Sequence, residues 1–295
     1  MLFRSPQSVA VAIVHGIGRQ KEDFASAIIQ QLRKRVAQQL GEDPQEAPRF
    51  FFEPVFWAPV LQKEEDELWS CLRKGGGLGW TELRGFMVDF AADAIAYQPI
   101  SGRRDAYDRV HAVFADALRR LAEQAGPRAP LCVISHSLGT VIACNFFYDL
   151  QAHSSEKPLI GQSVRQKLGN TPLSCGETLT LFYTMGSPVA LWSLRYDNFG
   201  KPIQVPSPKL RSHYPNLAGE WVNFYGKADV IGYPLKELNA DYRVAVTSDC
   251  PVLVGGPLAF WNPLSHMAYF GDTDVLGPIA EGLVGVWQTI NTAQE

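Results

Sequence analysis

Apolar residues in this chain gather in short uninterrupted runs separated by longer stretches of helical periodicity. The first two runs cover residues 9–14 and 50–57, and a helix-like stretch from about 22 to 40 lies between them. Gly41 and Pro44 then supply the signals that end a helix. The order strand, helix, strand predicts the beginning of a parallel sheet.

The same alternation continues through the rest of the chain. Further strands are predicted at 131–134, 178–184, 221–225 and 244–246, with a helix-like run after the first of these and a closing helix at 275–289. We therefore expect an α/β fold in which a mostly parallel central sheet lies between layers of helices.

Two regions do not fit a simple strand and helix alternation. Residues 61–125 are helical in pattern but longer than one crossover helix needs, so part of this stretch is expected to be an inserted helical element. It could form a lid over a site or pack on one face of the sheet. Residues 190–220 form a proline-rich, aromatic loop that the pattern leaves unassigned. Residues 1–295 are expected to form one domain with these insertions.

Composition and charge narrow the class of protein. The chain has 295 residues, of which 46% are hydrophobic and 19% charged, enough for one large α/β domain. A net charge of -3 and the lack of a basic cluster interleaved with aromatics argue against a nucleic-acid partner. Five scattered cysteines without a Cys-x-x-Cys pair argue against a disulfide framework and a zinc cluster, and most are expected to be buried thiols.

The first apolar run gives no sign of a targeting segment. Residues 9–14 are too few for a signal sequence or a membrane span and lead straight into a glycine motif. With unpaired cysteines, a cytoplasmic location is the expectation, and a peripheral membrane contact stays open.

A candidate nucleophile lies where the predicted strand 131–134 meets the next helix. Residues 135–139 read Ser-His-Ser-Leu-Gly, which places Ser137 between two small residues, Ser135 and Gly139. A serine in a strained strand-to-helix turn needs small residues two positions before and after it. This context predicts a nucleophile elbow centred on Ser137.

Two nearby serines compete with Ser137 and are less suitable. Centring the elbow on Ser135 would place branched Val133 in the crowded turn. Ser187 precedes Pro188, which has no N–H to stabilise an oxyanion.

A serine nucleophile needs a histidine to take its proton and a carboxylate to orient that histidine. Of six histidines, His213 and His266 remain once those in the elbow, the glycine motif, a helix and the loop past the elbow helix are set aside. Asp229, in a short loop after the predicted strand 221–225, is the leading acid. Asp249 is its rival, and Asp241 and Asp272 are weaker choices that suit turns or caps.

The oxyanion of an acyl-transfer intermediate needs backbone N–H donors. Leu138, directly after the nucleophile, supplies one. The second is expected from residues 14–18, Val-His-Gly-Ile-Gly, where glycines allow a sharp turn. This motif lacks the third glycine of a dinucleotide fingerprint and the Lys-Ser/Thr of a phosphate loop.

Taken together, these motifs resemble the α/β-hydrolase superfamily, in particular its lipase-like and esterase-like branch with a His-Gly oxyanion loop. The resemblance implies a three-layer sandwich, a serine, acid, histidine order that selects His266 as the base, and oxyanion donors at Ile17 and Leu138. It also implies a structural role for His15. It does not cover residues 61–125 or 190–220, which would shape substrate choice.

The expected activity is hydrolysis of a carboxylic ester by Ser137, His266 and Asp229 through an acyl-enzyme, with no metal or organic cofactor. The substrate is expected to be a small-molecule or lipid-like ester, and Phe86, Trp192 and Trp261 are candidates for an apolar pocket, with Arg19 for an anionic group. Thioesterase, acyltransferase and peptidase activities use the same machinery. A non-catalytic binding or scaffold protein on this fold is the alternative from another class, and the oligomeric state is left open.

Overall fold

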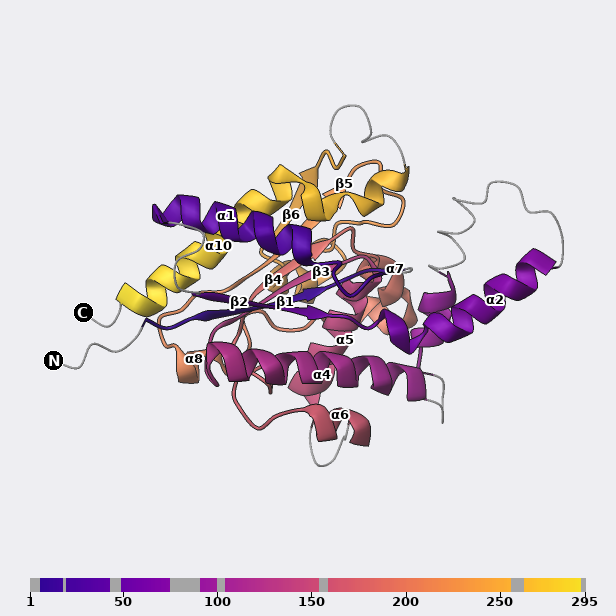
Figure 1. Ribbon diagram of the computed structural model, residues 1–295, viewed down its shortest axis with the longest axis horizontal. Helices are drawn as coiled ribbons and strands as arrows, with labels where there is room; N and C mark the ends of the chain where they lie inside the picture. Colours follow the sequence, from indigo (N-terminus) through magenta and orange to yellow (C-terminus); the bar gives the residue numbers. More distant parts are fainter. Residues whose placement is uncertain are drawn as a thin grey trace.

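The computed structural model describes residues 6–17, 20–42, 49–74, 91–99, 104–153, 159–255 and 263–292. A six-stranded sheet forms its centre, with all neighbouring strands parallel and in the order β2-β1-β3-β4-β5-β6 (Figure 1). The strands are β1 (Val9–Val14), β2 (Phe50–Val55), β3 (Leu131–His136), β4 (Leu179–Met185), β5 (Glu220–Gly226) and β6 (Ser248–Val252). The α/β sheet predicted from the sequence is confirmed.

Helices cover both faces of this sheet (Figure 1). One layer holds α1 and α10 side by side, and the other holds α4, α5 and α6. The long helices are α1 (Ser26–Leu40), α2 (Gln62–Lys74), α4 (Asp105–Ala125), α5 (Leu138–Ala152) and α10 (Thr273–Thr292), and the short ones α6 (Gln162–Lys167), α7 (Val189–Trp192), α8 (Leu210–His213) and α9 (Ala240–Ala245). The fold is therefore the three-layer α/β sandwich, with a parallel central sheet, that the sequence predicts.

The central strands are buried on both faces because each layer of helices needs an apolar partner. In β1, Val9, Val11 and Ile13 pack with α1 and α10, whereas Ala10, Ala12 and Val14 pack with α4 and α5. Alternate residues of a strand point to opposite faces, so a strand between two helical layers is apolar throughout. This is why the sequence shows an unbroken run at residues 9–14.

The register of the sheet brings two distant loops together. Val14 at the end of β1 pairs with Ser135 near the end of β3. The loop that follows β1 therefore lies beside the turn that follows β3, at the carboxyl edge of the sheet, where ligands bind in open α/β sheets.

One predicted strand is wrong. Residues 244–246 do not form a strand, because α9 occupies 240–245 and the final strand β6 begins only at Ser248. The Asn239 side chain accepts a hydrogen bond from the Tyr242 N–H and starts this helix. Val244 is 87% exposed, whereas Val246, just after the helix, is buried, so the run is divided between surface and core and does not form a strand.

The helical region after β2 divides into parts with different surroundings. Helix α4 packs on β2 and β1 and makes the crossover to β3, as ordinary sheet packing requires. Helix α2 projects away from the body of the molecule in Figure 1. Residues 75–90 and 100–103, including Phe86, lie outside the described residues.

The proline-rich stretch after β4 contains short helices: α7, two 3-10 turns (Ser193–Arg195 and Asp197–Phe199) and α8. A 3-10 turn also follows β2 (Ala58–Val60), and two more follow β6 (Pro263–Met267 and Tyr269–Gly271). All five cysteines are free. Cys132 is buried, Cys144, Cys175 and Cys250 are half-buried, and Cys71 is exposed, so the expectation that most would be buried is wrong. Among the described helices, none combines the length and apolarity needed to cross a membrane.

Candidate active site

Ser137 occupies a sharp turn between β3 and α5. Its backbone has φ 53° and ψ -130°, an unusual conformation for a residue other than glycine. Its N–H donates to the Met185 carbonyl at 2.9 Å, which ties the turn to β4. The elbow predicted from residues 135–139 thus has the strained backbone associated with functional turns.

The loop after β1 approaches this turn so closely that side chains are excluded. A Cβ on Gly16 would lie 2.6 Å from Cβ of Ser137, and one on Gly139 would lie 2.3 Å from the His15 carbonyl oxygen. Both glycines are therefore required by backbone approach. The contact places the loop directly against Ser137, where the sequence predicts an oxyanion loop.

His266 and Asp229 complete a hydrogen-bonded chain with Ser137. The Ser137 hydroxyl lies 2.8 Å from His266 Nε2, and His266 Nδ1 lies 2.8 Å from Asp229 Oδ2. Asp229 follows β5, and His266 lies in the turn Pro263–Met267 after β6. The structure brings these three predicted residues together from three separate strand ends. In such a chain the imidazole can take the serine proton while the carboxylate fixes its tautomer.

Asp229 is surrounded by donors that favour its ionised form. Its Oδ2 also accepts from the Tyr269 hydroxyl at 2.7 Å, and its Oδ1 accepts from the Ile231 N–H at 2.9 Å. Burial acts to raise the pKa of this carboxyl, but hydrogen bonds from His266, Ile231 and Tyr269 and the charge of His266 hold it below the ordinary value. Asp229 can therefore stay anionic while it orients the imidazole.

His15 holds the loop after β1 as a neutral imidazole. Its Nε2 accepts from the N–H groups of Trp57 and Ala58 at 3.1 and 3.3 Å, so its Nδ1–H donates to the Gly16 carbonyl at 2.7 Å. Burial lowers the pKa of His15 to about 3, although the bond to Gly16 opposes this. The geometry fits the structural role expected for His15. Ile17 is buried in this loop, whereas Gly18 and Arg19 lie outside the described residues.

The residues that competed with the triad in the sequence have other partners. Asp249 lies in β6, where its carboxylate accepts from the N–H groups of Leu235 and Lys236 at 2.8–3.0 Å. His213 lies 3.0 Å from the Glu177 carboxylate. These two side chains therefore hold loops and do not reach Ser137.

The competing serines are likewise engaged elsewhere. The Ser135 hydroxyl donates to the Tyr183 carbonyl at 3.2 Å. The Ser187 hydroxyl lies 2.8 Å from Thr140 Oγ1, and Thr140 Oγ1 also donates to the Ser137 carbonyl. Ser187 thus supports the elbow turn from the next strand along the sheet.

Three residues that shape the site were missed by sequence reasoning. His136 donates from Nε2 to the His266 carbonyl at 2.7 Å, with the two ring centroids 4.8 Å apart. Tyr269 bridges Asp229 and the Gly226 N–H. Gly186 has φ 54°, and a Cβ there would lie 2.9 Å from His266 Cε1. The only signal for Tyr269 was its position three residues after His266.

The site is closed to solvent in this structure. Ser137 and His266 are both 0% exposed, and Asp229 is 6% exposed. Within the described part of the chain, no group of three or more His, Cys, Asp and Glu residues is arranged to hold a metal ion.

The chain has the three-layer fold, with a parallel sheet between two layers of helices, that the sequence predicts. Among solved structures it is similar to dienelactone hydrolase from Anabaena variabilis ATCC 29413, with 14% identity over 96% of this chain and 86% of that chain, and a TM-score of 0.38. It is also similar to the esterase domain of a Rhodothermus marinus protein, with 13% identity over 95% and 86% of the two chains, and a TM-score of 0.33. No protein-family model and no curated protein matches the chain. Likeness at these TM-scores says nothing further about its chemistry.

Proposed function

We propose that the protein is a serine hydrolase that cleaves carboxylic esters through an acyl-enzyme. The observation that carries this proposal is the chain from Ser137 through His266 to Asp229, with two contacts of 2.8 Å and a serine held at φ 53°. Serine is a poor nucleophile unless a base takes its proton, and this geometry supplies the base together with its orienting acid.

In the proposed reaction, Ser137 Oγ attacks the acyl carbonyl while His266 Nε2 takes the hydroxyl proton. The carbonyl oxygen becomes an oxyanion, to which the N–H groups of Ile17 and Leu138 would donate. Collapse of this intermediate breaks the ester bond, and the imidazolium gives its proton to the departing alkoxide. A water molecule then attacks the acyl-enzyme by the same route and releases the carboxylic acid and free Ser137.

An ester is the substrate class that this machinery handles with fewest further requirements. A thioester or an amide would pass through the same intermediate, because the fold and the triad do not fix the leaving group.

A non-catalytic binding protein is the second candidate, and one observation favours it. Ser137 and His266 are 0% exposed, whereas a hydrolase needs a path by which its substrate reaches both. A protein that had kept the hydrolase fold for another purpose would not need such a path.

Labelling with a fluorophosphonate probe separates the two candidates. The wild-type protein is expected to form a covalent adduct, and Ser137→Ala to form none. Ser187→Ala is the matched control, because Ser187 is equally buried and its hydroxyl contacts Thr140 Oγ1 beside the elbow. It should still be labelled. A folded wild-type protein that resists labelling would exclude the hydrolase and support the binding protein.

A further inference from the structure

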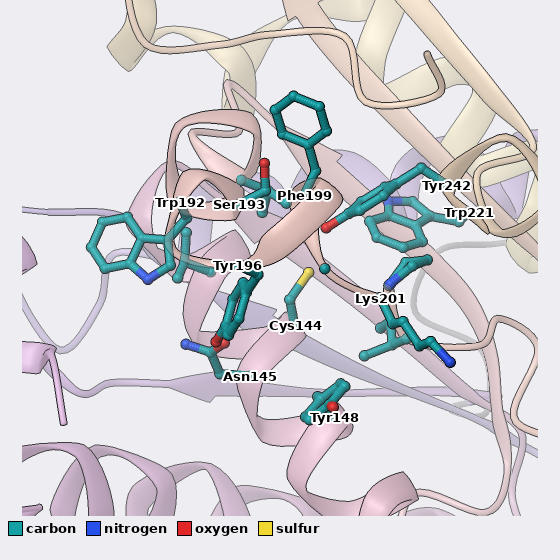
Figure 2. Close-up of a pocket in the computed structure, with 15 residues that line it drawn as sticks. Cys144, Asn145, Tyr148, Trp192, Ser193, Tyr196, Phe199, Lys201, Trp221 and Tyr242 are labelled. Atoms are coloured by element: carbon teal, nitrogen blue, oxygen red, sulfur yellow. The ribbon is translucent and has the colours of Figure 1, made fainter. Parts of the chain in front are cut away.

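A cavity of about 230 Å³ lies beside helix α5, away from the hydrogen-bonded chain. Val141, Cys144, Asn145 and Tyr148 form one of its walls, at the spacing that places residues on a single face of a helix. The segment 189–203, together with single residues of β5 and α9, forms the others (Figure 2). Ser137, His266, Ile17 and Leu138 are not among its lining residues.

Six of the fifteen residues that line the cavity are aromatic. In Figure 2, Trp192 and Tyr196 lie on one side, Trp221 and Tyr242 lie on the other, and the Cys144 sulfur lies between them. A dry cavity of about 150 Å³ is known to hold benzene, and sites for drug-sized ligands have roughly 300–1,000 Å³. The space of 230 Å³ therefore suits a molecule of one or two rings.

One side chain fixes two walls of this cavity. Asn198, Phe199 and Gly200 follow one another with φ values of 49°, 61° and 69°, a conformation that a bulky residue such as phenylalanine rarely adopts. Asn239 Nδ2 donates to the carbonyls of Asn198 and Gly200 at 2.7 and 3.0 Å. Its Oδ1 accepts from the N–H of Tyr242, so the same residue positions Phe199 and Tyr242. Such overdetermined strain is typical of functional sites.

The chemistry of the wall favours a neutral ligand with a hydrogen-bonding group, since Trp192 Nε1 is buried without a partner among the described residues and Asn145 offers a carboxamide oxygen. Burial raises the pKa of the Cys144 thiol, and it is also the main cause of the raised pKa of the Tyr242 hydroxyl. The interior of the cavity therefore disfavours charge. Asn145 Nδ2 donates to the Tyr97 hydroxyl at 3.2 Å, and that hydroxyl lies 2.8 Å from His111 Nε2. Within the described residues this arrangement leaves Asn145 Oδ1 to accept from a ligand.

We propose that this cavity binds a neutral aromatic molecule of one or two rings that carries a hydroxyl or N–H group, and that it does so independently of Ser137. The rings would stack among Trp192, Tyr196 and Tyr242, and the donor would reach the Asn145 carboxamide oxygen. This site stands whether or not the protein is a hydrolase.

Titration of the full chain with 2-naphthol, followed by tryptophan fluorescence and calorimetry, tests the proposal. The wild-type protein is expected to bind one equivalent saturably, and the tryptophan fluorescence should change because Trp192 and Trp221 line the cavity. Cys144→Phe places a ring inside the cavity and should weaken binding at least tenfold, whereas Cys144→Ser should bind as the wild type does. Tyr196→Ala removes a ring that is 52% exposed, so it should weaken binding without loss of the fold.

Three results would overturn the proposal. The first is the absence of saturable binding. The second is an equal affinity for the wild type and for both Cys144→Phe and Tyr196→Ala. The third is at least tenfold tighter binding of 2-naphthoate, which would point to Lys201 at the exposed edge. Ser137→Ala should bind 2-naphthol unchanged, and loss of binding there would place the ligand at the elbow instead. Fluorophosphonate labelling reports on Ser137 alone, so failure of one proposal is distinguishable from failure of the other.

Discussion

Two buried clusters in this molecule contain the same kinds of residue and differ in what they can do. Asp229, His266 and Tyr269 lie at the carboxyl edge of the sheet, next to Ser137. Asp149, His111 and Tyr107 lie between helices α4 and α5. Each set holds a carboxylate, an imidazole and a phenol, so residue type does not distinguish them.

The difference lies in distance and in the number of donors. His266 Nδ1 is 2.8 Å from its carboxylate, whereas His111 Nδ1 is 3.7 Å from Asp149 Oδ2, beyond a good hydrogen bond. Asp229 accepts three hydrogen bonds, and its pKa is lowered. Burial raises the pKa of Asp149 to about 6 despite the bond from Tyr107 and the charge of Arg104, and burial lowers the pKa of His111 to about 3. Short contacts to several donors therefore distinguish the hydrogen-bonded chain of Ser137, His266 and Asp229 from a buried polar packing cluster.

The largest expected effect comes from neutralising the acid in the first cluster. Asp229→Asn should reduce ester turnover by roughly 10⁴-fold, because an amide can no longer hold His266 in the tautomer that accepts the serine proton. Steady-state kinetics on an activated ester measures this. Asp249→Asn is the matched control, since its carboxylate holds only the N–H groups of residues 235 and 236 and Asn223. It should lower the free energy of unfolding by about 1–3 kcal/mol and change turnover less than tenfold. Equal losses of turnover in both variants would contradict the assignment of Asp229, and not Asp249, as the residue that orients His266.

A smaller effect is expected from Gly186, which makes room for His266. Gly186→Ala would place a Cβ 2.9 Å from His266 Cε1 and should lower kcat by about 10²-fold, because a displacement of about 1 Å costs that much in positioning. Gly41→Ala is the control, since Gly41 has a similar φ of 68° but no atom within 4 Å of the added Cβ. Both variants should lose about 1–2 kcal/mol of stability from left-handed backbone strain, and only Gly186→Ala should lose activity. Wild-type turnover in Gly186→Ala would show that His266 is not held against this glycine.

The order of strands and the position of the elbow could be predicted because they depend on local pattern. Unbroken apolar runs such as residues 9–14 mark strands buried on both faces, and small residues around Ser137 mark a turn under crowding. The run at 244–246 misled for the same reason, since three adjacent apolar residues look like a short strand although they lie at the end of a helix capped by Asn239.

The supporting residues of the site could not be predicted, because they depend on tertiary approach. Nothing in the neighbourhood of His136 shows that its ring will donate to the carbonyl of residue 266, which is 130 positions away. Tyr269 and Gly186 act through the same convergence of β4, β5 and the turns after β6. The distinction between Asp229 and Asp249 likewise needs the sheet, because both belong to its carboxyl half and only one faces His266.

The smallest expected effect concerns stability alone and tests the second cluster. The pKa of Asp149 in the folded state is about 6, above its ordinary value of 3.8, so the folded protein binds more protons than the unfolded chain between these values. Its contribution to stability is therefore full below about pH 4 and is lost as the pH rises to about 6, by up to about 3 kcal/mol. Asp229, with its lowered pKa, has the opposite sign and loses stabilisation on acidification. Asp149→Asn should thus gain stability relative to the wild type from pH 4 to pH 6 in urea unfolding, with turnover unchanged. A stability difference that stays constant across this range would mean that the pKa of Asp149 is not raised in the folded protein. The contrast between the two clusters would then rest on distance alone.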